Sequence, residues 1–168
     1  KKGSVLVIQA YMRIKLMTGM ARSDLLRIQS ADIKADGIHI QRHKTRGTTG
    51  KRTIYEWTPE LEEAVNLAKS VRPALSPFLF CTREGKGYIN EETGKANGWD
   101  SMWQRFMKRV LDETKVTEKF TEHDLRAKCA SDAESLEQAR ALLSHVDART
   151  TEAIYRRKPE RVRPLKGV

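Results

Sequence analysis

An ordered series of polar side chains in the last third of the chain most constrains what the chain can fold into. The series runs His123, Arg126, His145, Tyr155. Hydrophobic spacing predicts a helix around the first two residues, a short helix that ends just before His145, a turn, and a further helix around Tyr155. Each residue alone is ordinary, so the interpretation depends on the whole series and on what the rest of the chain adds.

Composition indicates one ordinary globular domain. The chain has 168 residues, of which 39% are hydrophobic and 32% charged, and this length is enough to bury a core. No stretch approaches the roughly 20 apolar residues of a membrane span, and no signal peptide is recognisable at the start. The two cysteines, Cys81 and Cys129, do not make a disulfide framework, so we expect reduced thiols and a cytoplasmic setting.

Positive charge is concentrated in two parts of the sequence. The formal net charge is +10 and the pI about 9.8. Lys and Arg outnumber Asp and Glu in residues 1–56 and 101–168, whereas residues 57–100 are slightly acidic. Solvated helix faces are one explanation for a basic total. The uneven distribution favours a polyanionic partner, most often nucleic acid.

Local patterns predict an α+β fold that is mostly helical, with a small antiparallel sheet. Asp36-Gly37 marks a turn, and two alternating segments flank a basic, glycine-containing tip, which is typical of a β-hairpin. The predicted strands are 38–41 and 52–57, and the predicted helices are 4–17, 21–28, 60–70 and 99–111. In the first helix we expect Leu6, Ala10, Ile14 and Met17 to face the core, and in the third Leu61, Ala64, Val65 and Ala68.

The two histidines and the arginine of the series each have an ordinary explanation beside the functional one. His123 and Arg126 are three positions apart on a helix, so both can face one anion; a surface histidine beside a salt-bridging arginine fits the same spacing. His145 follows an apolar helix end, where a capping or packed histidine is also common.

Tyr155 and Lys44 lie among other cations. Arg156 and Arg157 follow the tyrosine directly, and neighbouring cations stabilise a phenolate whose ordinary pKa is about 10. A core or surface aromatic is the alternative. Lys44 lies in the predicted hairpin tip, where it is either part of a solvated basic loop or a proton donor to a leaving alkoxide.

Together these segments resemble the tyrosine recombinases, the phage-integrase family. The resemblance covers essentially the whole chain and rests on five boxes in the family's order. They are the arginine box at 18–26, the hairpin at 38–57 with its lysine at Lys44, the HxxR box at 121–126, the LGH box at 143–145, and the nucleophile segment at 150–155. The resemblance implies that residues 1–168 are a catalytic domain, with the nucleophile and a basic tail in 155–168, and that the family's N-terminal core-binding domain is not part of this sequence.

The resemblance also implies roles for the candidate residues. Tyr155 would attack the scissile phosphate to form a 3′-phosphotyrosyl bond, and Lys44 would protonate the leaving 5′ oxygen. Arg126 and Arg22 would neutralise the phosphorane, His145 would donate to it, and His123 would support proton transfer. The expected DNA-contacting side chains are Arg42, Arg46, Lys51, Arg52, Arg156 and Arg157.

The implied partner is double-stranded DNA, bound by a tetramer of a phage-encoded or bacterial enzyme of DNA integration or excision. The reaction implied needs no metal and no cofactor, and His39 and His43 lack a convincing set of further ligands. A type IB topoisomerase, which uses the same chemistry, and a catalytically impaired DNA-binding module are the alternatives.

Two positions depart from the family pattern. Ser144 replaces the glycine of the LGH box, which we expect to be tolerated if the backbone there is not left-handed. In the first box an ungapped alignment places the arginine at position 21, which is Ala21, with Arg22 beside it. One position rotates a helical side chain by about 100°. Either the local backbone lets Arg22 reach the phosphate, or the first arginine is absent and the chain is impaired.

Overall fold

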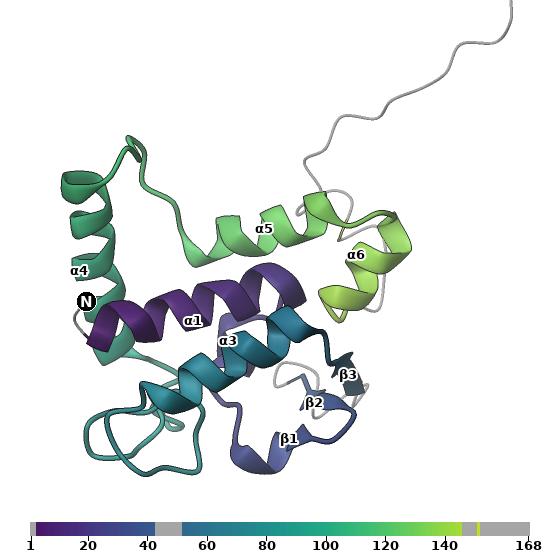
Figure 1. The fold of residues 1–168 in the computed structure, drawn as a ribbon, viewed down its shortest axis with the longest axis horizontal. Coiled ribbons are helices and arrows are strands. Elements are labelled where there is room, and N and C mark those ends of the chain that lie inside the picture. The colour runs from purple at the N-terminus through teal and green to yellow at the C-terminus, as the bar shows by residue number, and fades with distance from the viewer. Residues whose placement is uncertain (1–2, 43–51, 146–150, 152–168) are drawn as a thin grey trace, which may run out of the picture.

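The structure is a computed structural model that describes residues 3–42, 52–145 and 151. Helix α1 (Gly3–Thr18) runs through the middle of the molecule, with α3 (Pro59–Ser70) on one side and α5 (Glu122–Asp132) on the other (Figure 1). Helix α4 (Asn97–Glu113) crosses near the N-terminal end of α1. The mostly helical α+β architecture predicted from the sequence is confirmed.

The buried face of α1 joins an aromatic cluster that anchors α4. Tyr11 is fully buried, with its ring centroid 4.5 Å from that of Trp99 and 5.5 Å from that of Phe80. The Tyr11 hydroxyl donates to Glu122 at the start of α5, and Trp99 Nε1 donates to the same carboxylate at 3.1 Å. Burial raises the pKa of Tyr11 well above its usual value, and the Glu122 carboxylate adds to that rise. Glu122 thus joins α1, α4 and α5.

The predicted hairpin is confirmed and has a third, very short strand beside it. Strands β1 (Ile33–Lys34), β2 (Gly37–Gln41) and β3 (Arg52–Glu56) form an antiparallel sheet in that order. Ile38 pairs with Tyr55 on the buried face, and His39 pairs with Ile54 on the other. Two residues are too few to show the alternation that a sequence pattern needs, so β1 was not predicted.

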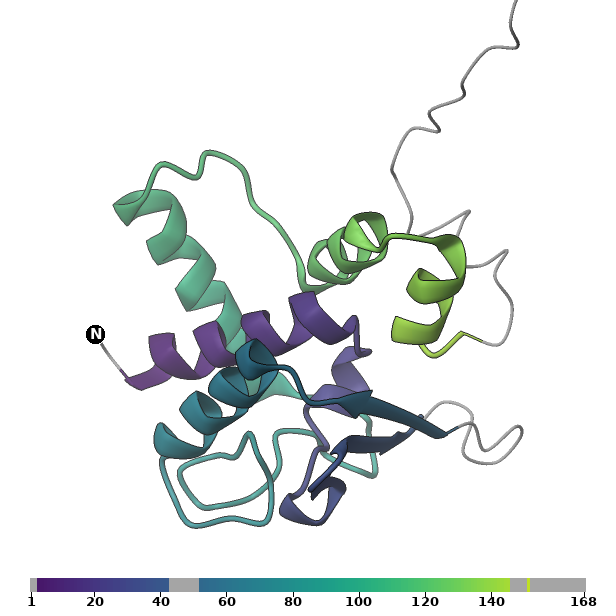
Figure 2. The ribbon, with the colours of Figure 1, turned by 45° about the vertical axis from the view of Figure 1, so that its right-hand side comes forward.

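The remaining short elements lie between the long helices and the sheet. The predicted helix at 21–28 is shorter in the structure, where only α2 (Arg22–Leu25) is helical, followed by a 3₁₀ turn, η1 (Ser30–Asp32). Helix α6 (Leu136–Leu142) follows α5 and lies above the sheet (Figure 2). Side-chain caps begin three helices, because a hydroxyl accepts the otherwise unpaired N–H of the first turn. These caps are Thr58, Thr121 and Ser135.

Candidate active site

Arg126 connects three segments that are far apart in the sequence. Arg126 is only 4% exposed. Its guanidinium donates to the carbonyl of Gly19, to the carbonyl of Leu143 at 2.9 Å and to His145 Nε2 at 3.1 Å. These bonds join the turn after α1, the end of α6 and the histidine that follows it. A buried guanidinium needs such partners, because a charge without them is costly to bury.

His145 is held from both sides of its ring. An arginine N–H can only donate, so Nε2 must accept from Arg126, and the ring proton then lies on Nδ1. Nδ1 is 2.8 Å from Thr151 Oγ1, to which it donates, and Thr151 is fully buried. The histidine is therefore fixed as one neutral tautomer between a cation and a hydroxyl.

The turn after α1 presents its carbonyls to buried cations. Gly19 has a φ of +62°, and a Cβ there would lie 2.7 Å from Leu143 Cδ2, so both the backbone and the packing favour glycine. Its carbonyl accepts from Arg126, and the next carbonyl, that of Met20, accepts from Lys15 Nζ at 2.9 Å. Lys15 is 1% exposed. Burial lowers the pKa of Lys15 to about 8.

Arg22 is directed toward two carboxylates. Its Nη2 lies 2.7 Å from Asp100 Oδ1 on α4, and its Nη1 lies 3.5 Å from Glu122 Oε2 at the start of α5. Ala21, at the position aligned with the family's first arginine, is the residue that precedes α2 and has an extended backbone. Arg126, by contrast, binds backbone carbonyls and His145. Arg22 thus connects α2 with α4 and α5 through these two ion pairs.

Ser144 does not meet the condition under which the sequence predicts that a serine is tolerated there, because its backbone is left-handed. Its φ is +53°, in the left-handed region where an L side chain costs on the order of 1 kcal/mol. Its buried hydroxyl lies 2.7 Å from Thr53 Oγ1 and 3.2 Å from the Tyr55 hydroxyl. Tyr55 also donates to the Leu142 carbonyl at 2.7 Å, and burial raises the pKa of Tyr55 to about 12. Hydrogen bonds to the hairpin therefore offset the strain that glycine would relieve.

The other predicted site residues divide between the described and undescribed parts of the chain. His123 is exposed, one turn before buried Arg126 on α5. Arg42 Nη1 donates to the Ser144 carbonyl at 3.4 Å, and Arg52 is exposed at the start of β3. The remaining predicted site residues lie outside the described residues; they are Lys44, Arg46, Lys51, Tyr155, Arg156 and Arg157.

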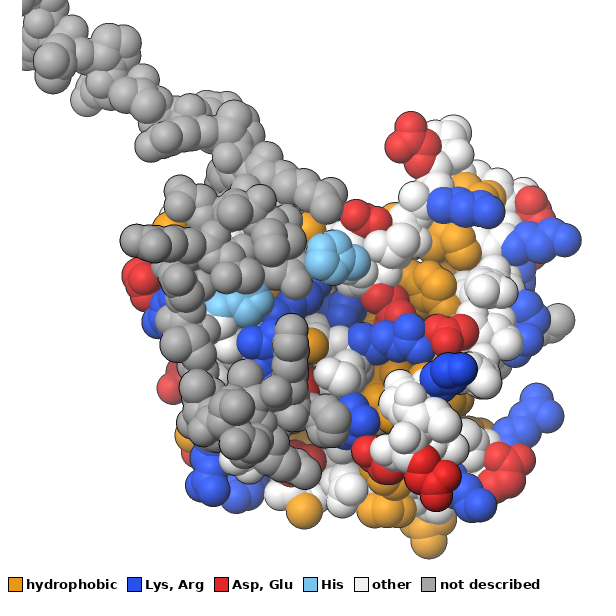
Figure 3. All heavy atoms as spheres, turned by 180° about the vertical axis from the view of Figure 1, so that it is seen from behind, with side chains coloured by type: hydrophobic (Ala, Val, Ile, Leu, Met, Phe, Trp, Pro, Cys, Tyr) orange, Lys and Arg blue, Asp and Glu red, His pale blue; other side chains and the backbone are white. Residues whose placement is uncertain are grey.

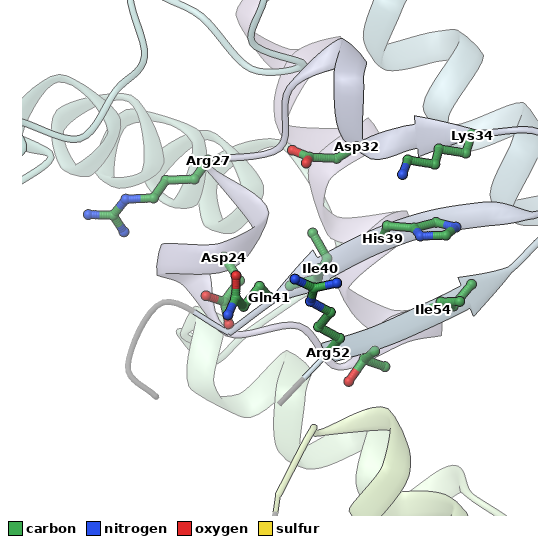
Figure 4. A pocket seen from close by; sticks show the side chains of 10 residues that line it. Asp24, Arg27, Asp32, Lys34, His39, Ile40, Gln41, Arg52 and Ile54 are labelled. Atoms are coloured by element: carbon green, nitrogen blue, oxygen red, sulfur yellow. The ribbon is translucent and has the colours of Figure 1, made fainter. Parts of the chain in front are cut away.

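A polar cavity lies beside the hairpin, on the side away from the buried face of the sheet. Its volume is about 410 Å³. Figure 4 shows Lys34 and His39 toward one end and Asp24, Gln41 and Arg52 toward the other. In Figure 3, Lys and Arg side chains form a band across the middle of one face, near two His side chains and with Asp and Glu interspersed. The basic excess seen in the sequence is thus partly gathered on one face.

The described residues offer neither a metal-binding cluster nor a membrane-spanning helix. Within residues 3–42, 52–145 and 151, no group of three or more His, Cys, Asp or Glu side chains could hold a metal ion. In those same residues, no helix has the length and apolar character needed to cross a membrane. Cys81 and Cys129 are both buried free thiols.

Sequence reasoning missed three contributors to this site. Lys15 lies on a helix where a lysine is usually exposed, and only its position on the inner side of the helix, next to Ile14, could have indicated burial. Thr151 was not singled out from the sequence as a site residue, and its hydrogen bond with His145 is a tertiary contact that no local pattern specifies. Ser144 was recognised as a substitution, but its bonds to Thr53 and Tyr55 join residues about 90 positions apart.

Comparison with solved structures identifies the fold. The chain is similar to a lambda integrase dimer bound to a COC′ core site, with 15% identity and a TM-score of 0.65 over 94% of this chain and 56% of that one. It is also similar to the XerA recombinase, with 18% identity and a TM-score of 0.62 over 92% of this chain and 58% of that one. A third similar structure is the Tn1549 transposon integrase in complex with circular intermediate DNA, with 16% identity and a TM-score of 0.65 over 91% of this chain and 54% of that one.

These neighbours contain a tyrosine recombinase catalytic domain, and this chain has the fold of that domain. It spans just over half the length of each of these solved chains. No protein-family model and no curated protein matches the sequence.

Proposed function

We propose that this chain is the catalytic domain of a site-specific DNA recombinase that cleaves and rejoins DNA through a 3′-phosphotyrosyl intermediate, for integration or excision. The observation that carries the proposal is the Arg126–His145 pair, buried at the meeting point of three segments in a tyrosine recombinase fold. A fold alone hosts many functions. The pair adds a cation and an imidazole at positions where the sequence independently resembles the family's boxes.

In the proposed reaction the Tyr155 oxygen attacks the phosphorus in line, and the bond from phosphorus to the 5′ oxygen breaks. Lys44 gives a proton to that oxygen, and His123 assists the transfer of the phenol proton. Arg126 and His145 donate to the non-bridging oxygens, where charge develops. The 5′ hydroxyl of a partner strand can then reverse the step, because the covalent link retains the phosphodiester energy.

The contacts of His145 suggest what substrate binding must change. Without DNA, Nε2 accepts from Arg126 and has no proton to donate. A phosphate that takes over the guanidinium N–H releases Nε2. A proton taken up from solvent at Nε2 then makes the ring an imidazolium that donates to the same anion. The Arg126–His145 bond is then a resting contact that the substrate replaces, while Thr151 still holds Nδ1.

Several described residues support a DNA-contacting surface around the hairpin. Arg52 and Lys34 line the cavity beside β2 and β3, and the basic side chains on one face (Figure 3) suit a phosphate backbone. One solved structure is a lambda integrase tetramer bound to a Holliday junction, and its chain is similar to this one with 16% identity and a TM-score of 0.58. By analogy we propose that this chain also self-associates on DNA.

The test is covalent capture on a pool of nicked duplexes with randomised central positions, which retain the protein once they are cleaved. We expect a protein–DNA adduct that survives denaturation and is lost in Tyr155→Phe. Because an arginine at position 21 would complete the family's first box, Ala21→Arg is assayed in parallel. An adduct that persists in Tyr155→Phe would show that another residue is the nucleophile.

A second candidate is a DNA-binding module of the same fold with little or no cleavage. The observation that favours it is Arg22, whose guanidinium is paired with Asp100 and Glu122 while position 21 is an alanine. If neither the parent chain nor Ala21→Arg forms an adduct, yet both bind duplex DNA with an affinity that falls as salt rises, this second function is supported.

A further inference from the structure

The turn that carries His145 is bound directly to the β-hairpin. Thr53, in β3, lies 2.7 Å from the Ser144 hydroxyl, and Tyr55 of the same strand lies 3.2 Å from it. From the other strand's end, Arg42 donates to the Ser144 carbonyl. The two contacts from Arg42 and Thr53 come from either side of residues 43–51, the predicted basic tip.

The turn at Ser144 restricts the backbone of His145, which follows it. The N–H of Ser144 donates to the Ala141 carbonyl at 3.0 Å, and that of His145 donates to the Arg140 carbonyl at 3.0 Å. Arg140 returns a bond to the His145 carbonyl at 2.9 Å. With its backbone fixed in this way, the imidazole position depends on the left-handed conformation of Ser144.

We propose that Ser144 is a positioning residue that couples the hairpin to His145. Its hydroxyl fixes the left-handed turn against Thr53 and Tyr55, so movement of the hairpin on DNA is transmitted to the imidazole. Glycine would adopt this φ without strain, but it would leave the hairpin and the turn joined by fewer bonds. Serine at this position thus costs some backbone strain, and its hydroxyl connects the proposed DNA-contacting hairpin to the active site. This inference rests on the proposed function for its catalytic consequence but not for the coupling itself.

The first experiment measures the ring of His145 in the DNA-free chain. Histidine labelled with ¹⁵N reports which ring nitrogen carries the proton, and the His145 signals are assigned by their loss in His145→Gln. We expect a fixed Nδ1–H tautomer in the parent. In Ser144→Gly and in Thr53→Val, which removes the partner hydroxyl, the signals move toward a mixture of tautomers, whereas Thr53→Ser keeps the hydroxyl and the parent pattern.

The double variant identifies coupling rather than two separate effects. If the hydroxyl link is responsible, adding Thr53→Val to Ser144→Gly shifts the His145 signals no further than Ser144→Gly alone. Unmoved signals in Ser144→Gly, or shifts that add in the double variant, would overturn the proposal. Ser144→Ala, which keeps the strained backbone and loses the hydroxyl, serves as a check that fold and thermal midpoint survive the loss of the bond.

The second experiment measures adduct formation on the nicked pool. We expect Ser144→Gly to slow it about tenfold, the effect of roughly one net hydrogen bond. Duplex binding should change by less than about twofold, because the hydroxyl is buried against Thr53 and Tyr55. A parent that forms no adduct contradicts the proposed function, and the ¹⁵N result then decides the coupling alone. An adduct rate in Ser144→Gly equal to that of the parent refutes the catalytic consequence.

Discussion

The two halves of the candidate site are built differently. On the side of α5 and α6, Arg126, His145 and Thr151 form a continuous chain of hydrogen bonds among buried groups. On the side of α2, Arg22 is partly exposed and paired with Asp100 and Glu122. The difference shows that one half is preorganised around a buried cation, whereas the cation of the other half serves to hold helices together. Five substitutions test this comparison.

Arg126→Met should have the largest effect. It removes the donors to two buried carbonyls and to His145, so we expect the free energy of unfolding to fall by about 2–4 kcal/mol. Adduct formation should fall on the order of 10³-fold in the fraction that stays folded. Denaturant unfolding and capture on the nicked pool measure the two effects. Arg109→Met is the matched control, because Arg109 is exposed and paired with Glu113 four residues away; a similar loss there would refute the special role of Arg126.

Lys15 should make stability depend on pH. Its pKa is about 8 in the folded chain and 10.5 ordinarily, so between these values the unfolded chain binds more protons and stability rises with pH. The groups that act on Lys15 electrostatically are Glu122, Arg126, Arg22 and Asp24. Relative to Lys15→Met, the parent should gain about 2–3 kcal/mol of unfolding free energy from pH 7 to pH 10.

Chemical denaturation at each pH measures this difference, and subtracting the variant removes the contributions of tyrosines and cysteines that titrate in the same range. A difference between parent and Lys15→Met that is constant across the range would contradict the buried position of Lys15.

Gly19→Ala tests the turn that both halves share. The added methyl group would meet Leu143 at 2.7 Å in a left-handed backbone, and we expect a loss of about 2–3 kcal/mol in unfolding free energy. Gly94→Ala is the matched control: its φ is +67° with nothing within 4 Å of the new Cβ, so it measures the backbone cost alone, about 1 kcal/mol. Equal losses would mean that Gly19 does not pack closely against Leu143.

Arg22→Ala should have the smallest effect. Its ion pairs are partly exposed, and such pairs contribute less than about 1 kcal/mol to stability. If Arg22 only connects helices, adduct formation should change by less than about threefold, since no transition-state contact is lost. Thermal unfolding and the capture assay measure both. A loss near 100-fold in cleavage with unchanged stability would instead make Arg22 the anion-binding arginine.

The sequence predicted those parts of the fold that local patterns determine. The hairpin register follows alternation along 38–41 and 52–57, and all four predicted core positions of α3 are buried. In α1, Ala10 and Ile14 are buried as expected, but Leu6 and Met17 are only half-buried while Lys15 is buried. A lysine enters a core only when the fold supplies a partner, here the Met20 carbonyl.

For the candidate site, the order of the boxes could be predicted but not the contacts among them. Arg126 and His145 were selected from their motifs and lie together in the structure. The pairing of Arg22 with Asp100 joins residues 78 positions apart, and the left-handed Ser144 is held by bonds from the hairpin. Both depend on packing between elements, which no local pattern encodes. The roles proposed for Tyr155 and Lys44 stay predictions from the sequence.

The most direct test of the contrast between the two halves is the rate of adduct formation by Ala21→Arg compared with the parent chain on the same nicked pool. If Ala21 occupies the position of an anion-binding arginine and the rest of the site is preorganised, the rate should rise about 100-fold, the usual contribution of one preorganised donor. The rise should disappear when Tyr155→Phe is added. An unchanged rate in Ala21→Arg, from a parent chain that does cleave, would contradict the account and return the arginine role to Arg22.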